Sequence, residues 1–357
     1  MGQIGRDIMK TRVTMFCWVL VVLPFACGLA KAQERSAIAA VFQGGLPGEN
    51  PELVQALSSE LGRVGYSVIA LDSESLCDAT KLSASAIDVL VLPSAGNLPL
   101  ASTATIGKYA EGGGDIIAVD APLWRNLYIN PRGQWETLDA YERQTAAELP
   151  EHVLFDFTQE GIAGWQRGSF PTDIAGTYET VEEGPAPGRR SLHVKLDEMK
   201  GWDNFGPASL DNPFKEGDTL TVFAAKGAPG TRSLSIEWQE SDGSRWIAVV
   251  ALSAEWRRYV LTPEDFKFWE SVPARSSDTF HPENARRVNI GLSLTHTGTT
   301  PGAKEYWVSA FGTSSLRPEM QGVLVKPVIP AMDTLAPGYK FFRSEERRVG
   351  KECRSRW

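Results

Sequence analysis

The chain has 357 residues and a formal net charge of -8 at pH 7. Its apolar fraction of 42% excludes an intrinsically disordered protein, and its length predicts two domains, or three small ones. Between residues 33 and 342, 26 Lys and Arg stand against 40 Asp and Glu, a net charge of -14. This acidic body argues against nucleic acid or anionic lipid as a partner, because phosphate binding needs a basic surface.

Residues 1–32 have the organisation of a signal peptide. Basic residues up to Arg12 precede an uncharged apolar run over 13–29, and Ala-Lys-Ala at 30–32 supplies the small residues that a signal peptidase reads. A short membrane anchor is the alternative, but Pro24 and Gly28 interrupt the run and favour cleavage after residue 32. We therefore expect an exported protein that is periplasmic, extracellular or on the cell surface, with no membrane attachment after cleavage.

Residues 33–127 predict an α/β domain. Four runs rich in Val, Ile, Leu and Ala fit strands of a parallel sheet that is covered on both faces. A helix is expected to begin at Pro51 with Asn50 as its N-cap, and glycine-terminated helical sequence follows at 102–114. Strands and helices in this order predict a three-layer, flavodoxin-like or amidotransferase-like domain. The four predicted strands are 37–42, 66–72, 87–93 and 115–122.

The stretches "IDVLVLPSAG" and "YAEGGGDIIAVDAP", with a helix between them, resemble the class I glutamine-amidotransferase-like fold, including the trimerisation domains of β-galactosidases. The resemblance implies that the position of the family's nucleophilic Cys falls on Asp120 and that of its elbow Gly on Pro122. A carboxylate cannot replace a thiolate in acyl transfer, and no His follows in this domain to activate one. The resemblance thus implies a degenerate, non-catalytic domain and makes the chain a candidate for oligomerisation.

Asp120 has two interpretations. It ends a strand before a proline, where a carboxylate commonly caps a turn. Alternatively, it lines a ligand pocket together with Ser94 and Asn97, because open α/β sheets bind ligands at the carboxyl ends of their strands.

A polar, helical connector is expected over 128–150, and the sequence pattern is different over 151–313. Short stretches of alternating polar and apolar residues, separated by turn residues, predict a jelly-roll β-sandwich. The nine predicted strands are "HVLFDF", "GTYETV", "SLHVKL", "DTLTVFAA", "SLSIEWQE", "SRWIAVVAL", "EWRRYVLT", "RVNIGLSL" and "EYWVSAF".

Within this segment, "FDFTQEGIAGWQRG", "EWRRYVLTPEDF" and "EYWVSAFG" resemble jelly-roll carbohydrate-binding modules that are appended to secreted glycoside hydrolases. Sugars stack their C–H faces on aromatic rings, and polar groups at the ring edge fix their orientation. Trp165, Trp202 and Trp269 are candidate platforms because polar or glycine residues flank them, and Trp202 in "KGWDNFGP" is the preferred one. Four further tryptophans lie in strand patterns and are expected in the core: Trp238, Trp246, Trp256 and Trp307.

The same resemblance implies a structural calcium ion, held by carboxylates near the first and last strands of the module. Asp156 and Glu160 are the candidate ligands at the first strand. The last strand reads Trp-Val-Ser over 307–309 where the family usually shows Asp, which argues against the ion. No other cofactor is expected.

No catalytic motif is present: the sequence lacks G-x-S-x-G, H-E-x-x-H, paired C-x-x-C and a phosphate-binding glycine loop. Residues 314–342 contain four Pro and predict a linker to a further domain. Residues 343–357, "RSEERRVGKECRSRW", are similar to the in-frame translation of a common sequencing-library adapter. Cys77 is the only cysteine outside residues 1–32 and this tail, so no internal disulfide is expected.

Three functions remain open. The first is the polysaccharide-binding, non-catalytic N-terminal region of an exported glycoside hydrolase whose catalytic domain is truncated here. The second is a stand-alone periplasmic or surface protein that binds polysaccharides or oligosaccharides. The third, a small-molecule hydrolase that uses the α/β domain, has the least support.

Overall fold

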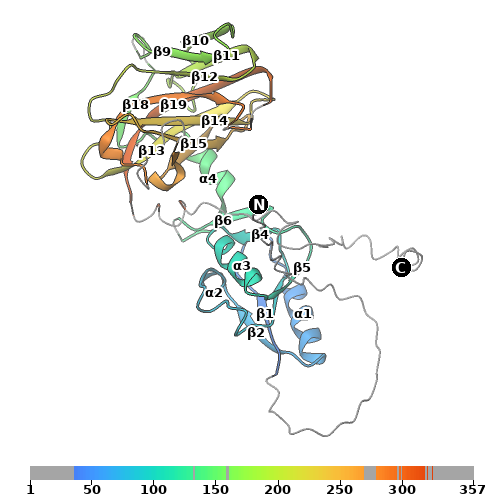
Figure 1. Ribbon diagram of the computed structural model, residues 1–357. Helices are drawn as coiled ribbons and strands as arrows, with labels where there is room; N and C mark the ends of the chain where they lie inside the picture. Colours follow the sequence, from blue (N-terminus) through green and yellow to red (C-terminus); the bar gives the residue numbers. More distant parts are fainter. Residues whose placement is uncertain are drawn as a thin grey trace, which may run out of the picture. The chain divides into compact units, whose positions relative to one another are not determined.

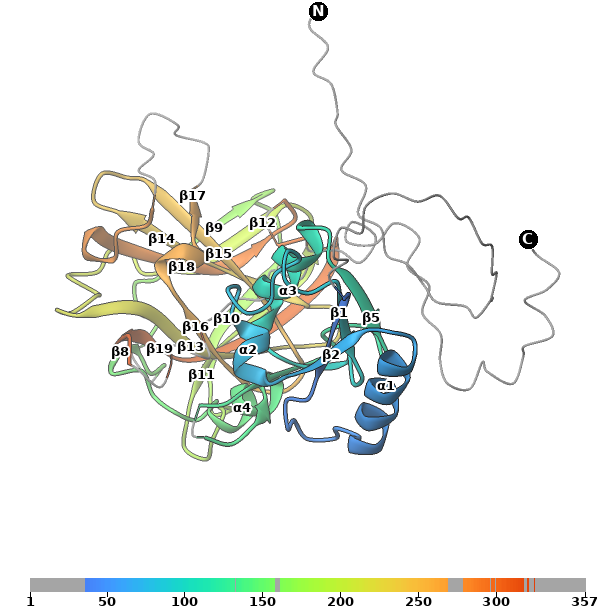
Figure 2. The same ribbon diagram turned by 90° about the horizontal axis from the view of Figure 1, so that it is seen from below.

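The structure is a computed structural model that describes residues 36–324, except 132, 158–160, 269–278, 296, 299, 318–319 and 321–323. The described residues form two units that divide between Leu138 and Asp139 (Figures 1 and 2). None of the helices in this part of the chain is both long and apolar enough to cross a membrane. The predicted signal peptide, the linker beyond residue 324 and the adapter-like tail lie outside the described residues.

The first unit is built on a parallel four-stranded sheet in the order β2-β1-β3-β5, as the four apolar runs predict. Its side chains alternate between two cores because successive residues of a strand point to opposite faces. Residues such as Val41 and Val91 pack with α1, and residues such as Ala40 and Leu90 pack with α2 and α3. The sheet is therefore covered on both faces. The elements are β1 (Ile38–Phe42), α1 (Pro51–Arg63), β2 (Ser67–Leu71), α2 (Ser73–Cys77), β3 (Val89–Leu92), α3 (Ser102–Glu111) and β5 (Asp115–Ala118).

Local sequence explains where α1 begins. The Asn50 side chain accepts a hydrogen bond from the backbone N–H of Leu53 at 3.1 Å, and Pro51 occupies the first helical position, as predicted. The unit also contains a small three-stranded sheet, in the order β4-β6-β7, that the sequence did not predict. It comprises β4 (Asn97–Pro99), β6 (Asn126–Ile129) and β7 (Glu136–Thr137).

The second unit is a sandwich of two antiparallel sheets, which confirms the predicted β-sandwich. The β19 sheet has the order β10-β11-β19-β13-β16, with β8 also paired to β19, and the β18 sheet has the order β17-β15-β14-β18-β12-β9. Strands close in sequence repeatedly change sheets, as in a jelly roll. The strands are β8 (His152–Phe155), β9 (Gln166–Phe170), β10 (Gly176–Val181), β11 (Ser191–Met199), β12 (Trp202–Gly206), β13 (Asp218–Gly227), β14 (Ser233–Glu240), β15 (Arg245–Ala251), β16 (Arg257–Leu261), β17 (Lys267–Phe268), β18 (Ala285–Ser293) and β19 (Gly302–Ser315).

The inner faces of both sheets form one core. Leu234, Ile236 and Trp238 alternate inward along β14 and meet Tyr306 and Phe311 of β19. Trp246 belongs to the same core, so the prediction holds for two of the four tryptophans expected there. Because every second residue of β14 and β18 points into the core, the residues between them point away from it.

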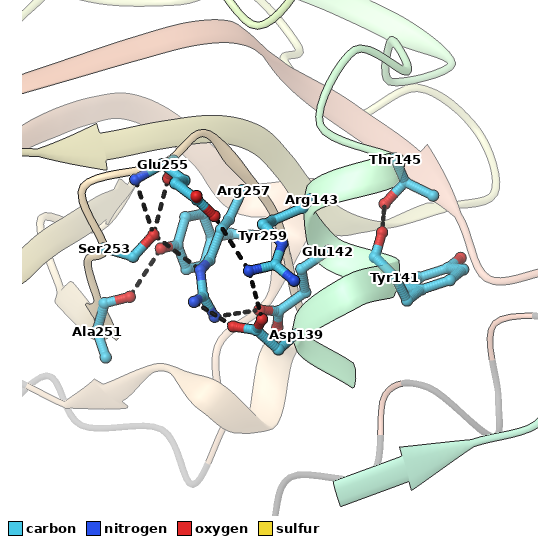
Figure 3. A network of polar contacts seen from close by, with 10 residues as sticks. All are labelled: Asp139, Tyr141, Glu142, Arg143, Thr145, Ala251, Ser253, Glu255, Arg257 and Tyr259. Carbon is cyan, nitrogen blue, oxygen red and sulfur yellow. Dashed lines mark hydrogen bonds and ion pairs between the residues drawn. The ribbon is translucent and has the colours of Figure 1, made fainter. Parts of the chain in front are cut away.

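The predicted connector contains one short helix, α4 (Leu138–Gln144), which contacts the sandwich through ion pairs (Figure 3). Arg257 of β16 pairs with Asp139 and, at 3.4 Å, with Glu142, and Arg143 pairs with Glu255 at 3.1 Å. The C-terminal part of the connector therefore belongs to the sandwich unit, and α4 covers its edge strand β16.

Candidate functional site

Two exposed aromatic side chains lie side by side on the outward face of the β18 sheet. Trp202 of β12 is 40% exposed, and Phe170 of β9 is 63% exposed. The two residues are directly opposite each other in the antiparallel pair β9–β12, which brings their side chains to one face. Among the described residues, no other aromatic side chain is exposed rather than buried or half-buried. This pair is the clearest stacking platform in that part of the chain.

The Trp202 indole lies over the backbone of β9 at Gly168, which is diagonal to it in the register and has no side chain. A Cβ atom at Gly168 would come within 3.1 Å of Cζ3 and 3.4 Å of Cη2 of the indole. The ring can therefore rest on the strand. A ring supported in this way is held in place before a ligand arrives, which lowers the entropy lost on binding.

A strip of small residues crosses the sheet next to the platform. The register places Gly168 of β9 opposite Asn204 of β12, Asn204 opposite Gly291 of β18, and Gly291 opposite Ser235 of β14. Val249 of β15, 44% exposed, ends the strip opposite Ser235. This strip leaves the backbone of four strands covered only by short side chains.

Hydrogen-bonding side chains border the strip on the side away from the platform. Glu237 accepts two hydrogen bonds from Arg245, Nε to Oε1 at 3.0 Å and Nη2 to Oε2 at 2.5 Å. The same Oε1 accepts from Nδ2 of Asn289 at 3.0 Å. These contacts hold three polar side chains from β14, β15 and β18 in fixed orientations; Glu237 and Asn289 are buried, and Arg245 is half-buried.

An ion pair on the inward face joins the two strands that carry the platform. Asp203, which is 1% exposed, accepts from Nε of Arg167 at 2.8 Å and from the Tyr178 hydroxyl at 2.5 Å. Burial raises the pKa of the Asp203 carboxyl, and the hydrogen bonds from Tyr178 and Arg167 oppose that shift. Because Asp203 and Phe205 of β12 point inward, the alternate residues Trp202 and Asn204 are directed outward.

The structure separates the three predicted platform tryptophans. Trp202 is exposed, as its sequence context predicts. Trp165 is half-buried, and its ring contacts those of Phe155 and Phe205 at centroid distances of 4.8 and 5.2 Å, so it packs as a core side chain and not as a platform. Trp269 lies outside the described residues.

The candidate calcium ligands are only partly described. Asp156 is exposed just after β8, and Glu160 lies outside the described residues. Within the described part of the chain, no group of three or more His, Cys, Asp or Glu side chains converges on a point where a metal ion would fit.

In the α/β unit, the candidate pocket residues do not form a ligand cavity. Ser94 and Asn97 line a hollow near Phe42 and Glu49 whose volume of about 10 Å³ admits roughly one water molecule. Asp120 does not line it, and is exposed with a backbone φ of 77°, in the left-handed region that Asp tolerates better than most residues.

Cys77 is the one described cysteine and ends α2. Burial raises the pKa of its thiol to about 11, so the group is protonated near neutral pH. A protonated thiol is a weak nucleophile.

Most residues of the candidate face were not predicted from the sequence. They are Phe170, Asn204, Glu237, Arg245 and Asn289. A usable signal was present for β18, because Val288, Ile290 and Leu292 point into the core and the alternate residues must therefore point outward. No such signal was present for Phe170, since β9 carries Arg167 on its inward side.

Comparison with family models found no match, and neither did comparison with curated proteins. Among solved structures, the sandwich is similar to the family 11 carbohydrate-binding module of cellulosomal cellulase Lic26A-Cel5E of Clostridium thermocellum, with 14% identity, a TM-score of 0.37, and coverage of 48% of this chain and 97% of that one. A family 61 module in complex with β-1,4-galactotriose matches with 9% identity, a TM-score of 0.29, and coverage of 45% and 99%. An exo-β-agarase matches with 9% identity, a TM-score of 0.34, and coverage of 48% and 26%.

Proposed function

We propose that the sandwich unit is a glycan-binding module and that it binds a polysaccharide or oligosaccharide on the outward face of the β18 sheet. The observation that carries the proposal is the pair of exposed rings, Trp202 and Phe170, next to a strip of small residues that polar side chains border. Apolar C–H faces of a sugar can stack on the rings while its hydroxyls meet the polar border.

The proposal extends to the whole chain in the form that the sequence suggests. The module would bring an exported glycoside hydrolase to its polymer, the α/β unit would be a non-catalytic relative of class I amidotransferase-like domains, and residues 1–32 would direct export. A stand-alone glycan-binding protein is the alternative. Sequencing the natural coding region past residue 342 distinguishes them, because only a hydrolase continues into a catalytic domain there.

Affinity electrophoresis tests the binding face. The protein is run through gels that contain one of a panel of plant and algal polysaccharides, and retardation by at least one polymer is expected. Trp202→Ala should lower the affinity for that polymer at least about tenfold, because it removes the supported half of the platform.

Trp256→Ala is the matched control. Trp256 is half-buried and directly precedes β16, an edge strand of the β19 sheet. The Lys226 ammonium is 5.4 Å from its ring centroid. The variant should bind as the wild type does. Absence of retardation by every polymer, or equal losses in the two variants, would contradict the proposed site.

A further inference from the structure

Among the described residues, one arginine on the proposed binding face has no acidic partner. Arg287 is on the outward side of β18, two residues before Asn289. Its Nε is buried and has no hydrogen-bond partner, and no ion pair joins it to a carboxylate of the described residues. A buried donor without a hydrogen-bond partner is unfavourable for the folded protein.

The neighbouring charges do not neutralise Arg287. The register places it opposite Gln239 of β14, which is in turn opposite Arg245 of β15. Arg245 is already held by both oxygens of Glu237. Glu237, which is diagonal to Arg287 in the register, is thus committed to the other arginine, and the amide of Gln239, directly opposite Arg287, is a second, neutral donor.

We propose that Arg287, with Gln239 beside it, binds an acidic group of the glycan, a uronate carboxylate or a sulfate ester. This inference rests on the proposed function. A planar guanidinium forms paired hydrogen bonds with such oxyanions, and these are stronger than hydrogen bonds between neutral groups. Because the body of the protein has a net charge of -14, long-range attraction does not favour a polyanion, and recognition depends on this short-range contact.

Matched pairs of polymers test the inference. Binding of the wild-type protein is measured by affinity electrophoresis and calorimetry with polygalacturonate and its carboxyl-reduced form, and with a sulfated galactan and its desulfated form. We expect tighter binding to the acidic member of one pair. The pair that shows the preference identifies the acidic group as carboxylate or sulfate.

Arg287→Gln should lower the affinity for that acidic polymer about tenfold and leave binding to its neutral counterpart unchanged. Arg286→Gln is the control, since it removes the same charge from the adjacent residue, which points to the opposite side of the strand and donates to the carbonyl oxygens of Glu283 and Ala285. It should bind as the wild type does.

Equal affinity for both members of each pair, or equal losses in Arg287→Gln and Arg286→Gln, would overturn the inference. If a neutral polymer still binds in a Trp202-dependent manner, the proposed function survives that result. If no polymer binds at all, the proposed function and the inference both fall.

Discussion

The two outward faces of the sandwich differ in how accessible their aromatic rings are. On the β18 sheet, Trp202 and Phe170 are exposed and lie beside small residues. On the β19 sheet, Trp307 also points outward, since its neighbours Tyr306 and Val308 belong to the core. Trp307 and Trp256 are therefore not the core residues that their strand patterns predicted.

Both sides of the Trp307 ring are occupied. The His193 ring stacks on it at a centroid distance of 4.7 Å and an interplanar angle of 8°, and the Lys226 ammonium is 4.5 Å from its centroid. His193 is held in turn by Glu179 at 3.1 Å and Glu305 at 2.8 Å. Further along the same sheet, Met320 and Leu324 pack on outward residues of β13.

An outward tryptophan ring can stack on a ligand only where no other side chain packs on it. Trp307 packs against other side chains on one face, whereas Trp202 is exposed on the other. The following predictions test that division, from the largest expected effect to the smallest.

Asp203→Asn should lower the free energy of unfolding by about 3 kcal/mol, because it leaves the Arg167 guanidinium without its buried counter-ion. Urea denaturation measures the change. Asp173→Asn, an exposed change in the turn after β9, is the control and should remain within about 0.5 kcal/mol of the wild type. A loss for Asp203→Asn that is no greater than the control's would mean that the inward ion pair does not hold the platform strands together.

Trp307→Ala should lower the free energy of unfolding by about 2 kcal/mol, less than for a fully buried ring, and should leave glycan affinity unchanged. Trp202→Ala should do the reverse, with little change in stability and a large loss of affinity. Denaturation and affinity electrophoresis on the two variants measure both quantities. Loss of binding in Trp307→Ala with intact stability would contradict the proposal, because it would place the binding site on the β19 sheet.

Arg257→Gln should lower the free energy of unfolding by about 1 kcal/mol, since it removes the partly exposed ion pairs between β16 and α4. Because these pairs are accessible to salt, the difference from the wild type should shrink when NaCl is added. Glycan affinity should not change, and a change would indicate that α4 influences the binding face.

Gly168→Ala should reduce glycan affinity a few-fold with a stability change within about 0.5 kcal/mol. The new Cβ would approach Oδ1 of Asn204 to 2.7 Å and Cζ3 of Trp202 to 3.1 Å, so both side chains must move. A shift in tryptophan fluorescence and affinity electrophoresis measure the effect. Gly62→Ala in α1, where a Cβ meets no atom within 4 Å, is the control.

Much of the fold could be predicted from local patterns. Continuous apolar runs indicated the parallel sheet, and Asn50-Pro51 indicated the start of α1. The strands β9 and β12 were not predicted, because "QRGSF" and "WDNFG" contain glycine and polar residues that are rare in strands. Their inward positions hold Arg167 and Asp203, which is the reverse of the usual apolar pattern.

The sequence by itself determined the acidic net charge and the alternating pattern that predicted a β-sandwich in the second half. The polar residues that flank Trp202 were also enough to predict its exposure. Only the tertiary structure decided which other side chains share a face with Trp202. Phe170, Asn289 and Arg287 come from strands that are distant in sequence, and their proximity depends on the antiparallel register. The exposure of a ring likewise depends on which side chains of other strands pack against it, as His193 and Lys226 do on Trp307. The residues next to Trp307 in the sequence do not indicate these contacts.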